Sequence, residues 1–347
     1  MSDATCVLSD FDLAGAKVPL RGRSALPVSR PWARLLIVHG YGEHCGRYVH
    51  FMQWLAERGV ACEAIDLRGH GRSPGRRGFV RRWEEYLDDL QAFLQRGSAT
   101  TPIGADRGLV SEPGRVGPDF AERSRTGGPE VSLAPPSAPT QHSAPSTQHS
   151  PLFVMGHSHG GLITAAAGER GILARARVAA CIIASPYLAT RVPVSRRKRL
   201  LAHAANRIVP WLRVPKGVKP EWLSSDPAML AEDRADPLLT RVATPRWYLT
   251  MRVVQKRVLA DAPQFTLPVL CISGAADVVA DPRATTEFYN HAGSKDKSLY
   301  VYENRAHELI REAGRERVFA DILGWMRVRA TQPTCAERDE RLCPAGL

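Results

Sequence analysis

No apolar run in this 347-residue chain approaches the ~20 residues that a membrane-spanning helix needs, so we do not expect a transmembrane protein. The first residues, Met-Ser-Asp-Ala-Thr-Cys, contain neither a basic start nor an apolar segment, and we expect no secretory signal peptide. Cysteine is scarce: there are seven, an odd number, with no recurring paired spacing. This usage argues against a disulfide-stabilised secreted domain and predicts a cytoplasmic protein with reduced thiols.

Signatures of metal, cofactor and nucleic-acid binding are also missing. His142 and His149 lie in a repeated Gln-His-Ser string, but no cysteine or carboxylate cluster accompanies them. The net charge of +12 comes from 47 Lys and Arg against 35 Asp and Glu, without a nucleic-acid-binding motif. We therefore expect no metal, cofactor or nucleic-acid partner, and we interpret the charge as a solvated basic face. The alternative is that the basic segment 191–199 contacts an anionic membrane surface.

Large apolar side chains are few in residues 97–150, which are rich in Gly, Pro, Ser and Thr. Such a segment cannot bury a core, so we expect a disordered insertion there and a disordered polar tail at 331–347. The remaining residues suffice for one large domain. We expect its core to comprise 1–96, 151–187 and 265–330, with a helical cap at 188–264.

Among the motifs that the sequence does contain, the most informative is Gly156-His157-Ser158-His159-Gly160. It follows the apolar run 152–155 and precedes the small-residue run 161–168. This order predicts a strand, a tight turn with the serine at its apex, and a helix, in which small neighbours let helix and strand approach closely. Ser158 is therefore the predicted nucleophile; the alternative is a loop that carries the pattern by chance.

A serine nucleophile needs a base and an acid that orients the base. The buried-strand pattern 267–273 leads to Asp277, and the next strand pattern, 298–302, leads to His307. Both follow strands, and sites in parallel sheets gather at the carboxyl ends of strands. Along the chain, the order Ser, Asp, His is also the order in which enzymes with this kind of sheet carry these three residues. We predict Asp277 as the acid and His307 as the base, while Asp281 is a competing acid that we interpret as a helix N-cap.

An oxyanion hole requires two backbone N–H groups directed at the developing negative charge. We expect one from His159, directly after the nucleophile. The apolar run 35–38 breaks into His39-Gly-Tyr-Gly-Glu-His44, where Gly40 lets the chain turn and the N–H of Tyr41 point at the site. The alternative is an ordinary strand-to-loop transition.

Strand and helix patterns alternate along the chain, which predicts an α/β fold with a mostly parallel, doubly wound sheet. The expected strands are 6–8, 18–21, 35–38, 61–65, 152–155, 179–184, 268–273 and 299–302. The expected helices are 48–58, 83–95, 162–170, 285–291 and 315–329. Between 186 and 265 no strand pattern occurs, and the helical segments 199–211 and 246–259 predict the cap.

Taken together, the strings 39–48, 66–73 and 156–160 with the Asp277 and His307 loops resemble the monoacylglycerol lipase and lysophospholipase branch of the α/β-hydrolases, of the serine aminopeptidase S33 type. The resemblance covers about residues 4–97 and 151–329. It implies a cofactor-free serine esterase that cleaves a monoacylglycerol or lysophospholipid, with the acyl chain under the cap. It also implies that His44 and Arg47 position the polar head of the substrate.

One residue departs from the family pattern: His159 stands where the family more often has methionine. Its backbone N–H would still serve the oxyanion, but we expect its imidazole to change the polarity of the site. The insertion before residue 151 is a second, larger departure from the usual loop length.

The predicted cap mixes basic residues with apolar ones such as Leu200, Leu201, Ile208, Trp247 and Met251. We expect an apolar underside toward an acyl chain and a charged outer face, although a simple packing role would use the same residues. Other enzymes on this fold, namely a prolyl-type aminopeptidase, a carbon–carbon hydrolase or a haloperoxidase, would keep the triad and differ in the cap. A non-catalytic binding module would have a damaged triad or oxyanion loop, and the sequence shows neither.

Overall fold

The computed structural model describes residues 6–13, 17–98 and 150–331. The insertion expected to be disordered at 97–150 and the tail expected to be disordered at 331–347 fall mostly on residues 99–149 and 332–347, which lie outside this description. Residues 97 and 98 belong to a helix. In the described residues no helix has the length and hydropathy required to span a membrane.

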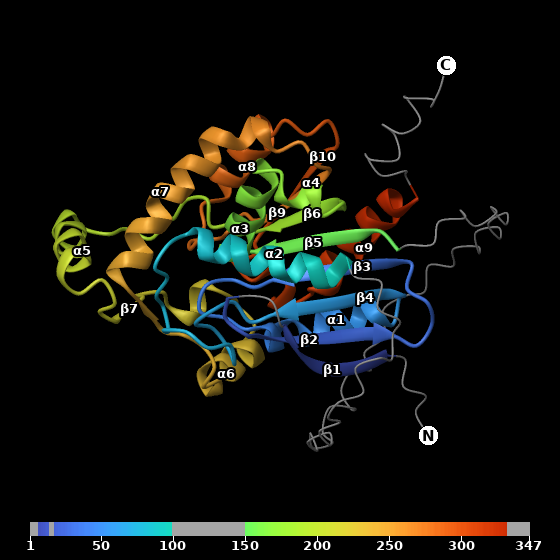
Figure 1. The fold of residues 1–347 in the computed structure, drawn as a ribbon, viewed down its shortest axis with the longest axis horizontal. Helices are drawn as coiled ribbons and strands as arrows, with labels where there is room; N and C mark the ends of the chain where they lie inside the picture. Colours follow the sequence, from blue (N-terminus) through green and yellow to red (C-terminus); the bar gives the residue numbers. More distant parts are fainter. Residues whose placement is uncertain (1–5, 14–16, 99–149, 332–347) are drawn as a thin grey trace, which may run out of the picture. The chain divides into compact units, whose positions relative to one another are not determined.

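A single eight-stranded sheet forms the centre of the described chain (Figure 1). Its order is β1 (Cys6–Leu13), β2 (Leu20–Pro27), β4 (Val60–Ile65), β3 (Ala33–Val38), β5 (Leu152–His157), β6 (Val178–Ala184), β9 (Val269–Gly274) and β10 (Lys297–Tyr302). Strand β2 is antiparallel to β1 and β4, and the other neighbours are parallel. The mostly parallel sheet is therefore confirmed, and each expected strand is present.

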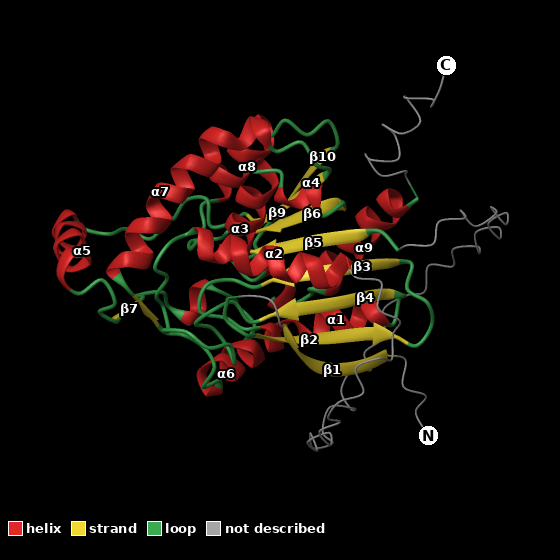
Figure 2. Cartoon of the chain, viewed as in Figure 1, coloured by secondary structure: helices red, strands yellow, loops and turns green. Residues whose placement is uncertain are grey.

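Helices cover both faces of the sheet (Figure 2). One core cluster joins α2 (Glu84–Ser98), α3 (His159–Glu169), α4 (Ile172–Arg175), α7 (Pro245–Asp261) and α8 (Pro282–His291) to alternate strand residues such as Leu36 and Val38. The other joins α1 (Val49–Ala56) and α9 (Glu316–Ala330) to Leu35 and Ile37. Strands buried on both faces explain the continuous apolar runs in the sequence.

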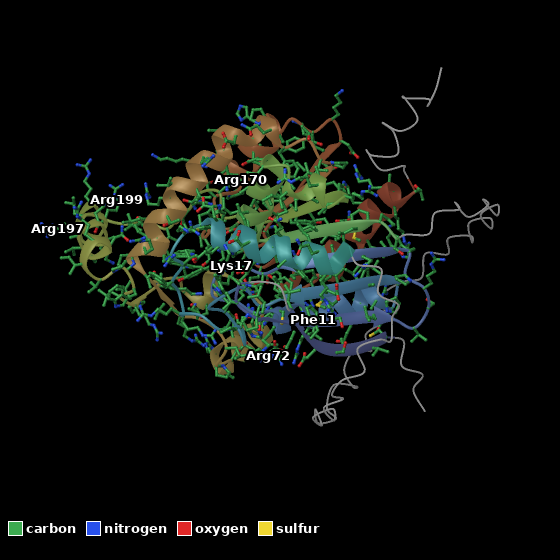
Figure 3. All side chains as sticks on the ribbon, viewed as in Figure 1. Phe11, Lys17, Arg72, Arg170, Arg197 and Arg199 are labelled. Atoms are coloured by element: carbon green, nitrogen blue, oxygen red, sulfur yellow. The ribbon has the colours of Figure 1, made fainter. Side chains whose placement is uncertain are left out.

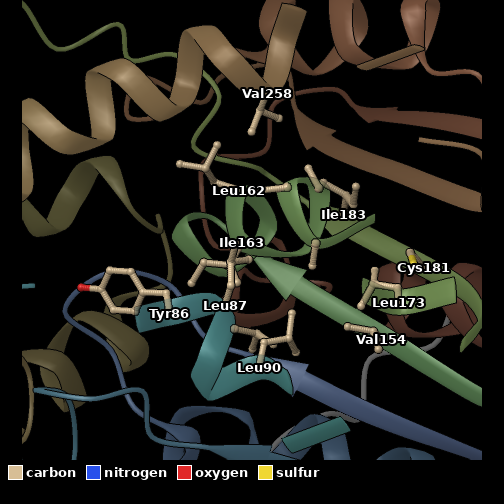
Figure 4. Packing of buried hydrophobic residues seen from close by; sticks show 14 of the residues in the cluster. Tyr86, Leu87, Leu90, Val154, Leu162, Ile163, Leu173, Cys181, Ile183 and Val258 are labelled. Carbon is tan, nitrogen blue, oxygen red and sulfur yellow. The ribbon is translucent and has the colours of Figure 1, made fainter. Parts of the chain in front are cut away.

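Helix α3 is the element that carries the site, and it is packed on all sides. Figure 4 shows its Leu162 and Ile163 among Val258 of α7 and Leu87 and Leu90 of α2. All these side chains are buried. The start of α3 is consequently held by the core as well as by the strand before it.

The cap lies between β6 and β9. It contains α5 (Arg196–Ile208), β7 (Val214–Pro215), η2 (Pro220–Trp222), α6 (Pro227–Ala235), β8 (Val242–Ala243), α7 and η3 (Ala262–Gln264). The two expected cap helices are present as α5 and α7. The expectation that the cap holds no strand is wrong, because β7 and β8 pair as a short antiparallel ribbon. Two-residue strands are too short to produce a recognisable alternation in the sequence.

The two cap helices bury their apolar residues differently. On α7, Trp247 is 5% and Met251 1% exposed, and α7 contacts α3. On α5, Leu200, Leu201 and Ile208 are 70%, 68% and 76% exposed, and no residue of that helix is buried. The buried apolar face of the cap therefore belongs to α7, and the expectation that Leu200, Leu201 and Ile208 form an apolar underside is wrong, because these residues face solvent.

A buried ion cluster attaches the cap to the core. Arg47, in η1 (Cys45–Tyr48), donates through Nη2 to both carboxylate oxygens of Glu308, at 2.7 and 2.6 Å, and pairs through Nη1 with Asp233 of α6. Arg311 donates to the same Asp233 at 3.0 Å and contacts Glu308 at 3.3 Å. The four side chains are at most 7% exposed. The two guanidinium groups and the two carboxylates thus neutralise one another's charge at a place that is nearly inaccessible to solvent.

We expect Arg47→Met to lower the free energy of unfolding by about 3–5 kcal/mol, because it leaves two buried carboxylates with Arg311 as their remaining cation. Urea unfolding followed by circular dichroism measures this loss. Arg234→Met is the matched control, since Arg234 lies next to Asp233 but pairs in solvent with Glu221 at 3.1 Å. We expect no measurable change in the control. Equal midpoints for the two variants would contradict a stabilising role of the cluster.

Candidate active site

Ser158 lies in the tight turn between β5 and α3, where the sequence predicts it. Its φ of 52° is in the left-handed region, which residues other than glycine seldom adopt. A Cβ on Gly160 would lie 2.0 Å from the carbonyl oxygen of Val38, and one on Gly156 would lie 2.3 Å from that of Gly160. Neither position has space for a side chain. The two glycines therefore allow the turn that presents Ser158.

His307 and Asp277 form a hydrogen-bonded line with Ser158. His307 Nε2 is 2.9 Å from Ser158 Oγ, and His307 Nδ1 is 2.7 Å from Asp277 Oδ2. An ionised carboxylate only accepts, so Nδ1 carries the proton and Nε2 is free to accept from the serine hydroxyl. Ser158 is 7% exposed, and the other two are 2% and 1% exposed. The predicted serine, base and acid are thus brought together.

The second oxygen of Asp277 is also fixed. Its Oδ1 accepts from the N–H groups of Val279 and Ala280, at 2.8 and 3.0 Å. The competing acid, Asp281, is instead the N-cap of α8 and pairs with Arg283 at 2.7 Å. The interpretation of Asp281 as a helix N-cap is therefore confirmed, and Asp277 is the carboxylate that contacts His307.

The loop after β3 lies against the nucleophile. A Cβ on Gly40 would be 3.1 Å from Ser158 Cβ. The next residue, Tyr41, donates through its hydroxyl to the carbonyl of Val242 at 2.8 Å, and its ring stacks on Trp247 with 3.6 Å between centroids. Loop and cap are therefore connected beside Ser158.

His39 fixes the orientation of this loop. Its Nδ1 donates to the Gly40 carbonyl at 2.7 Å, and its Nε2 accepts from the N–H of Leu67 at 3.0 Å. Burial lowers the pKa of His39, which favours the neutral ring that these two bonds require. The Gly40 carbonyl and the Tyr41 N–H point in opposite directions across their trans peptide bond. By holding the carbonyl, His39 sets the direction of the Tyr41 N–H.

His157, the residue before Ser158, forms a buried pair with Glu43. His157 Nδ1 is 3.2 Å from Glu43 Oε1, and the Tyr48 hydroxyl donates to Glu43 Oε2 at 2.8 Å. Burial disfavours the imidazolium, but the Glu43 carboxylate outweighs it and raises the pKa of His157. Burial likewise opposes the carboxylate, yet His157 and Arg47 hold the pKa of Glu43 well below its usual range. His157 Nε2 lies 3.4 Å from the backbone carbonyl of His307 and can donate to it when the ring is protonated.

His44 and Arg47 have partners in the cap. His44 Nε2 donates to Asp236 at 2.6 Å, while its Nδ1 accepts from the N–H of Gly46 at 3.1 Å. Arg47 is held in the ion cluster with Asp233 and Glu308. Both predicted head-group residues thus lie near the site, with their polar atoms bonded to protein.

His159 is the first residue of α3, so its N–H is among those at a helix start that have no acceptor within the helix. Its side chain is fully buried. Burial lowers the pKa of His159 well below its ordinary value. The backbone of His159 is thus available to the site, and its ring is a neutral group in the interior.

Sequence reasoning missed the roles of His39, Glu43, His157 and Tyr48. All four lie in or beside the strings 39–48 and 156–160 that we singled out, but the partner of each is set by the fold. The signal that could have found them is the concentration of polar residues directly after buried strands. That signal locates the site, but it does not show which of these side chains bond to each other.

A family model described as serine aminopeptidase, S33, matches residues 29–105 and 137–314. Among individual relatives, an uncharacterized abhydrolase domain-containing protein of Dictyostelium discoideum is 27% identical over 91% of this chain, which spans 28% of that protein's length. Phospholipase YtpA of Bacillus subtilis is 23% identical over 84% of this chain and 93% of its own length. A monoacylglycerol lipase of Mycolicibacterium smegmatis is 24% identical over 86% and 90%.

Among solved structures, a soluble variant of monoglyceride lipase from Saccharomyces cerevisiae superposes with a TM-score of 0.72 at 19% identity, over 95% of this chain and 98% of that one. This likeness shows a shared fold, the α/β-hydrolase fold that the sheet order displays. Because the family model matches most of the chain, including the segments that carry Ser158, Asp277 and His307, the chain belongs to the serine aminopeptidase S33 family.

Proposed function

We propose that this chain is a serine hydrolase that cleaves carboxylic esters, with monoacylglycerols or lysophospholipids as its substrates. The observation that carries the proposal is the hydrogen-bonded line from Ser158 through His307 to Asp277. The substrate class is supported by two relatives, one named a monoacylglycerol lipase and one a phospholipase. The five described cysteines are free thiols, which supports a cytoplasmic location.

In the proposed mechanism, His307 Nε2 takes the proton of Ser158 as Oγ attacks the ester carbonyl. The tetrahedral intermediate collapses, and the alcohol leaves with the proton from the His307 imidazolium. Water then attacks the acyl-enzyme by the same route and releases the acid. Asp277 holds Nδ1–H throughout and stabilises the imidazolium, while its bonds to two backbone N–H groups keep the carboxylate in position.

The N–H groups of Tyr41 and His159 are the proposed donors to the oxyanion. His159 opens α3, and Tyr41 follows the Gly40 backbone that lies against Ser158. One such donor contributes about 10²–10³ in kcat in comparable hydrolases. In this scheme His39 is a positioning residue, since it holds the peptide that carries the Tyr41 N–H.

We propose that His44 and Arg47 serve the substrate by holding the cap over the site. Direct contact with a polar head would require them to give up bonds to Asp236, Asp233 and Glu308. Breaking a buried ion pair is costly. The two residues instead place α6 and the loop of His307 in a fixed relation.

The exposed apolar residues of α5 support contact with a membrane surface that contains anionic lipid. Leu200, Leu201 and Ile208 fall within about 100° of the helix circumference. Residues 196–199 are Arg-Arg-Lys-Arg, and Figure 3 shows Arg197 and Arg199 extending outward from α5. Apolar side chains flanked by cations are typical of helices that lie in a lipid interface.

Other activities on this fold would use the same triad, so the choice among them depends on the substrate. A prolyl-type aminopeptidase would cleave prolyl amides, and a carbon–carbon hydrolase would cleave a carbon–carbon bond in place of an ester bond. A panel of monoacylglycerol, p-nitrophenyl esters and prolyl amides distinguishes them. We expect turnover of the esters only.

Ser158→Ala should abolish covalent labelling by a fluorophosphonate probe and lower ester turnover by several orders of magnitude, because no remaining group replaces the nucleophile. Gel-based labelling and p-nitrophenyl ester hydrolysis measure the two effects. Ser185→Ala is the control, since Ser185 directly follows β6 and the partner of His307 Nε2 is Ser158. Undiminished labelling of Ser158→Ala would refute the assignment.

Asp277→Asn should lower kcat by roughly 10⁴, because an amide no longer enforces the tautomer that leaves His307 Nε2 free. Asp281→Asn keeps an N-cap and should change kcat little. Steady-state kinetics on a soluble ester compares the two. A larger loss in Asp281→Asn would show that the acid was assigned to the wrong carboxylate.

Binding to vesicles of phosphatidylcholine with phosphatidylglycerol should weaken in the double variant Leu201→Ser/Ile208→Ser, because both side chains would insert into the interface. Co-sedimentation measures binding, and added salt should weaken it for the unaltered chain. Val253→Ser is the control, since Val253 is likewise exposed, at 68%, but belongs to α7 and not to α5. Equal binding by all three proteins would contradict the proposed contact.

A further inference from the structure

The short ribbon of β7 and β8 places one lysine of the cap over the loop that follows β3. Lys216 comes directly after β7, and its N–H donates to the carbonyl of Arg241 at 3.1 Å. The N–H of Thr240, just before β8, donates to the carbonyl of Gly42 at 2.8 Å. A Cβ on Gly42 would lie 3.0 Å from Lys216 Nζ. The ammonium group therefore lies against the loop whose Tyr41 N–H is the proposed donor to the oxyanion.

Lys216 Nζ has no bonded partner in the part of the chain that the structure describes: it makes neither a hydrogen bond nor an ion pair there. The carboxylates of Glu43 and Glu308 act on it through their charge. Both are bonded elsewhere, because Glu43 accepts from the Tyr48 hydroxyl at 2.8 Å and Glu308 accepts from Arg47 at 2.7 and 2.6 Å. The N–H donors of the ammonium group are therefore left for another molecule.

The surroundings of Lys216 disfavour its charge. The side chain is partly buried, and burial lowers the pKa of Lys216, although the charges of Glu43 and Glu308 oppose this effect. Lysine side chains usually extend their ammonium group into water, whereas this one directs Nζ at the backbone of Gly42. A cation withdrawn from water is costly unless acceptors and negative charge compensate it. The position therefore calls for an anionic group with free oxygen atoms.

The position of Lys216 relates this charge to the alcohol part of the substrate. In the proposed mechanism the leaving oxygen lies at His307 Nε2, because that nitrogen returns the proton. Glu308, whose charge acts on Lys216, is the residue after His307. Gly42 is two residues beyond Gly40, whose backbone lies against the nucleophile, and two residues span at most about 7 Å. A glycerol backbone esterified at one end has a comparable reach, so a group at its other end would come to Nζ.

Resting on the proposed ester hydrolysis, we propose that Lys216 is a specificity residue that binds the phosphate of a lysophospholipid, so that lysophospholipids are preferred to monoacylglycerols. Nζ donates to the phosphate oxygens while the ester lies at Ser158. A phosphate supplies both the acceptors and the negative charge that Nζ lacks in the described chain. The hydroxyl of a monoacylglycerol supplies an acceptor only and leaves the charge without a counter-ion.

The test compares octanoyl lysophosphatidic acid with monooctanoylglycerol, which differ by the phosphate alone, both below their critical micelle concentrations. The readout is the ratio of their kcat/KM values from released octanoate, because a general loss of activity cancels in it. We expect the unaltered chain to favour the phosphate ester by about tenfold or more, and Lys216→Met to remove that preference. Lys216→Arg keeps the charge and should retain part of it. Lys219→Met, which removes an exposed charge from the same segment of the cap, is the matched control and should keep the ratio of the unaltered chain.

Thermal unfolding separates recognition from packing. We expect Lys216→Met to melt no lower than the unaltered chain, because it replaces a cation without a bonded partner by an apolar side chain. A lower melting temperature with an equal loss on both esters would overturn the inference while leaving ester hydrolysis intact.

An equal ratio in the unaltered chain and in Lys216→Met would also overturn the inference. If inorganic phosphate then inhibits hydrolysis of monooctanoylglycerol by the unaltered chain but not by Lys216→Met, the lysine binds a free anion and not the substrate. Failure of the unaltered chain to hydrolyse these two esters and p-nitrophenyl esters would overturn the proposed function, and the inference with it.

Discussion

The close approach of α3 to β3 is the constraint on which the site depends. With 2.0 Å between a Cβ on Gly160 and the Val38 carbonyl, the helix start and the strand end meet through backbone alone. That contact places the loop of Gly40 and Tyr41 against Ser158. The strained φ of Ser158 persists because the buried residues of α3 on one side and β5 on the other hold both ends of the turn.

The second constraint is electrostatic and joins the cap to the same place. Arg47 and Arg311 connect Asp233 of the cap to Glu308, the residue that follows His307. A displacement of α6 would therefore pull on the loop of the proposed base. The Tyr41–Trp247 stack makes the corresponding connection from α7 to the proposed oxyanion loop. Each cap helix that covers the site is thus tied to one part of the proposed catalytic machinery.

Patterns within a few residues were enough to predict much of this molecule. The strands, the turn at Ser158 and the choice of Asp277 over Asp281 rest on local signals: apolar runs, glycines beside a serine, and an aspartate before a proline. What the sequence could not predict depends on distant partners. Arg47 meets Asp233 at a separation of 186 residues, so its involvement in the cap has no local signature. Likewise, the spacing of the apolar residues of α5 predicts that one face of the helix is apolar, but it does not predict whether another element covers that face. In the structure the face is exposed.

The two histidines on either side of Ser158 are both buried, yet their pKa values shift in opposite directions. Desolvation disfavours the cation of each, but Glu43 lies beside His157 and raises the pKa of that ring, whereas the rings around His159 include no carboxylate and its pKa falls. The ring with the raised pKa is thus the one whose Nε2 lies near the backbone carbonyl of His307. A carboxylate placed on one side of the nucleophile therefore makes the two neighbouring imidazoles chemically different, although the sequence repeats the same residue type around Ser158.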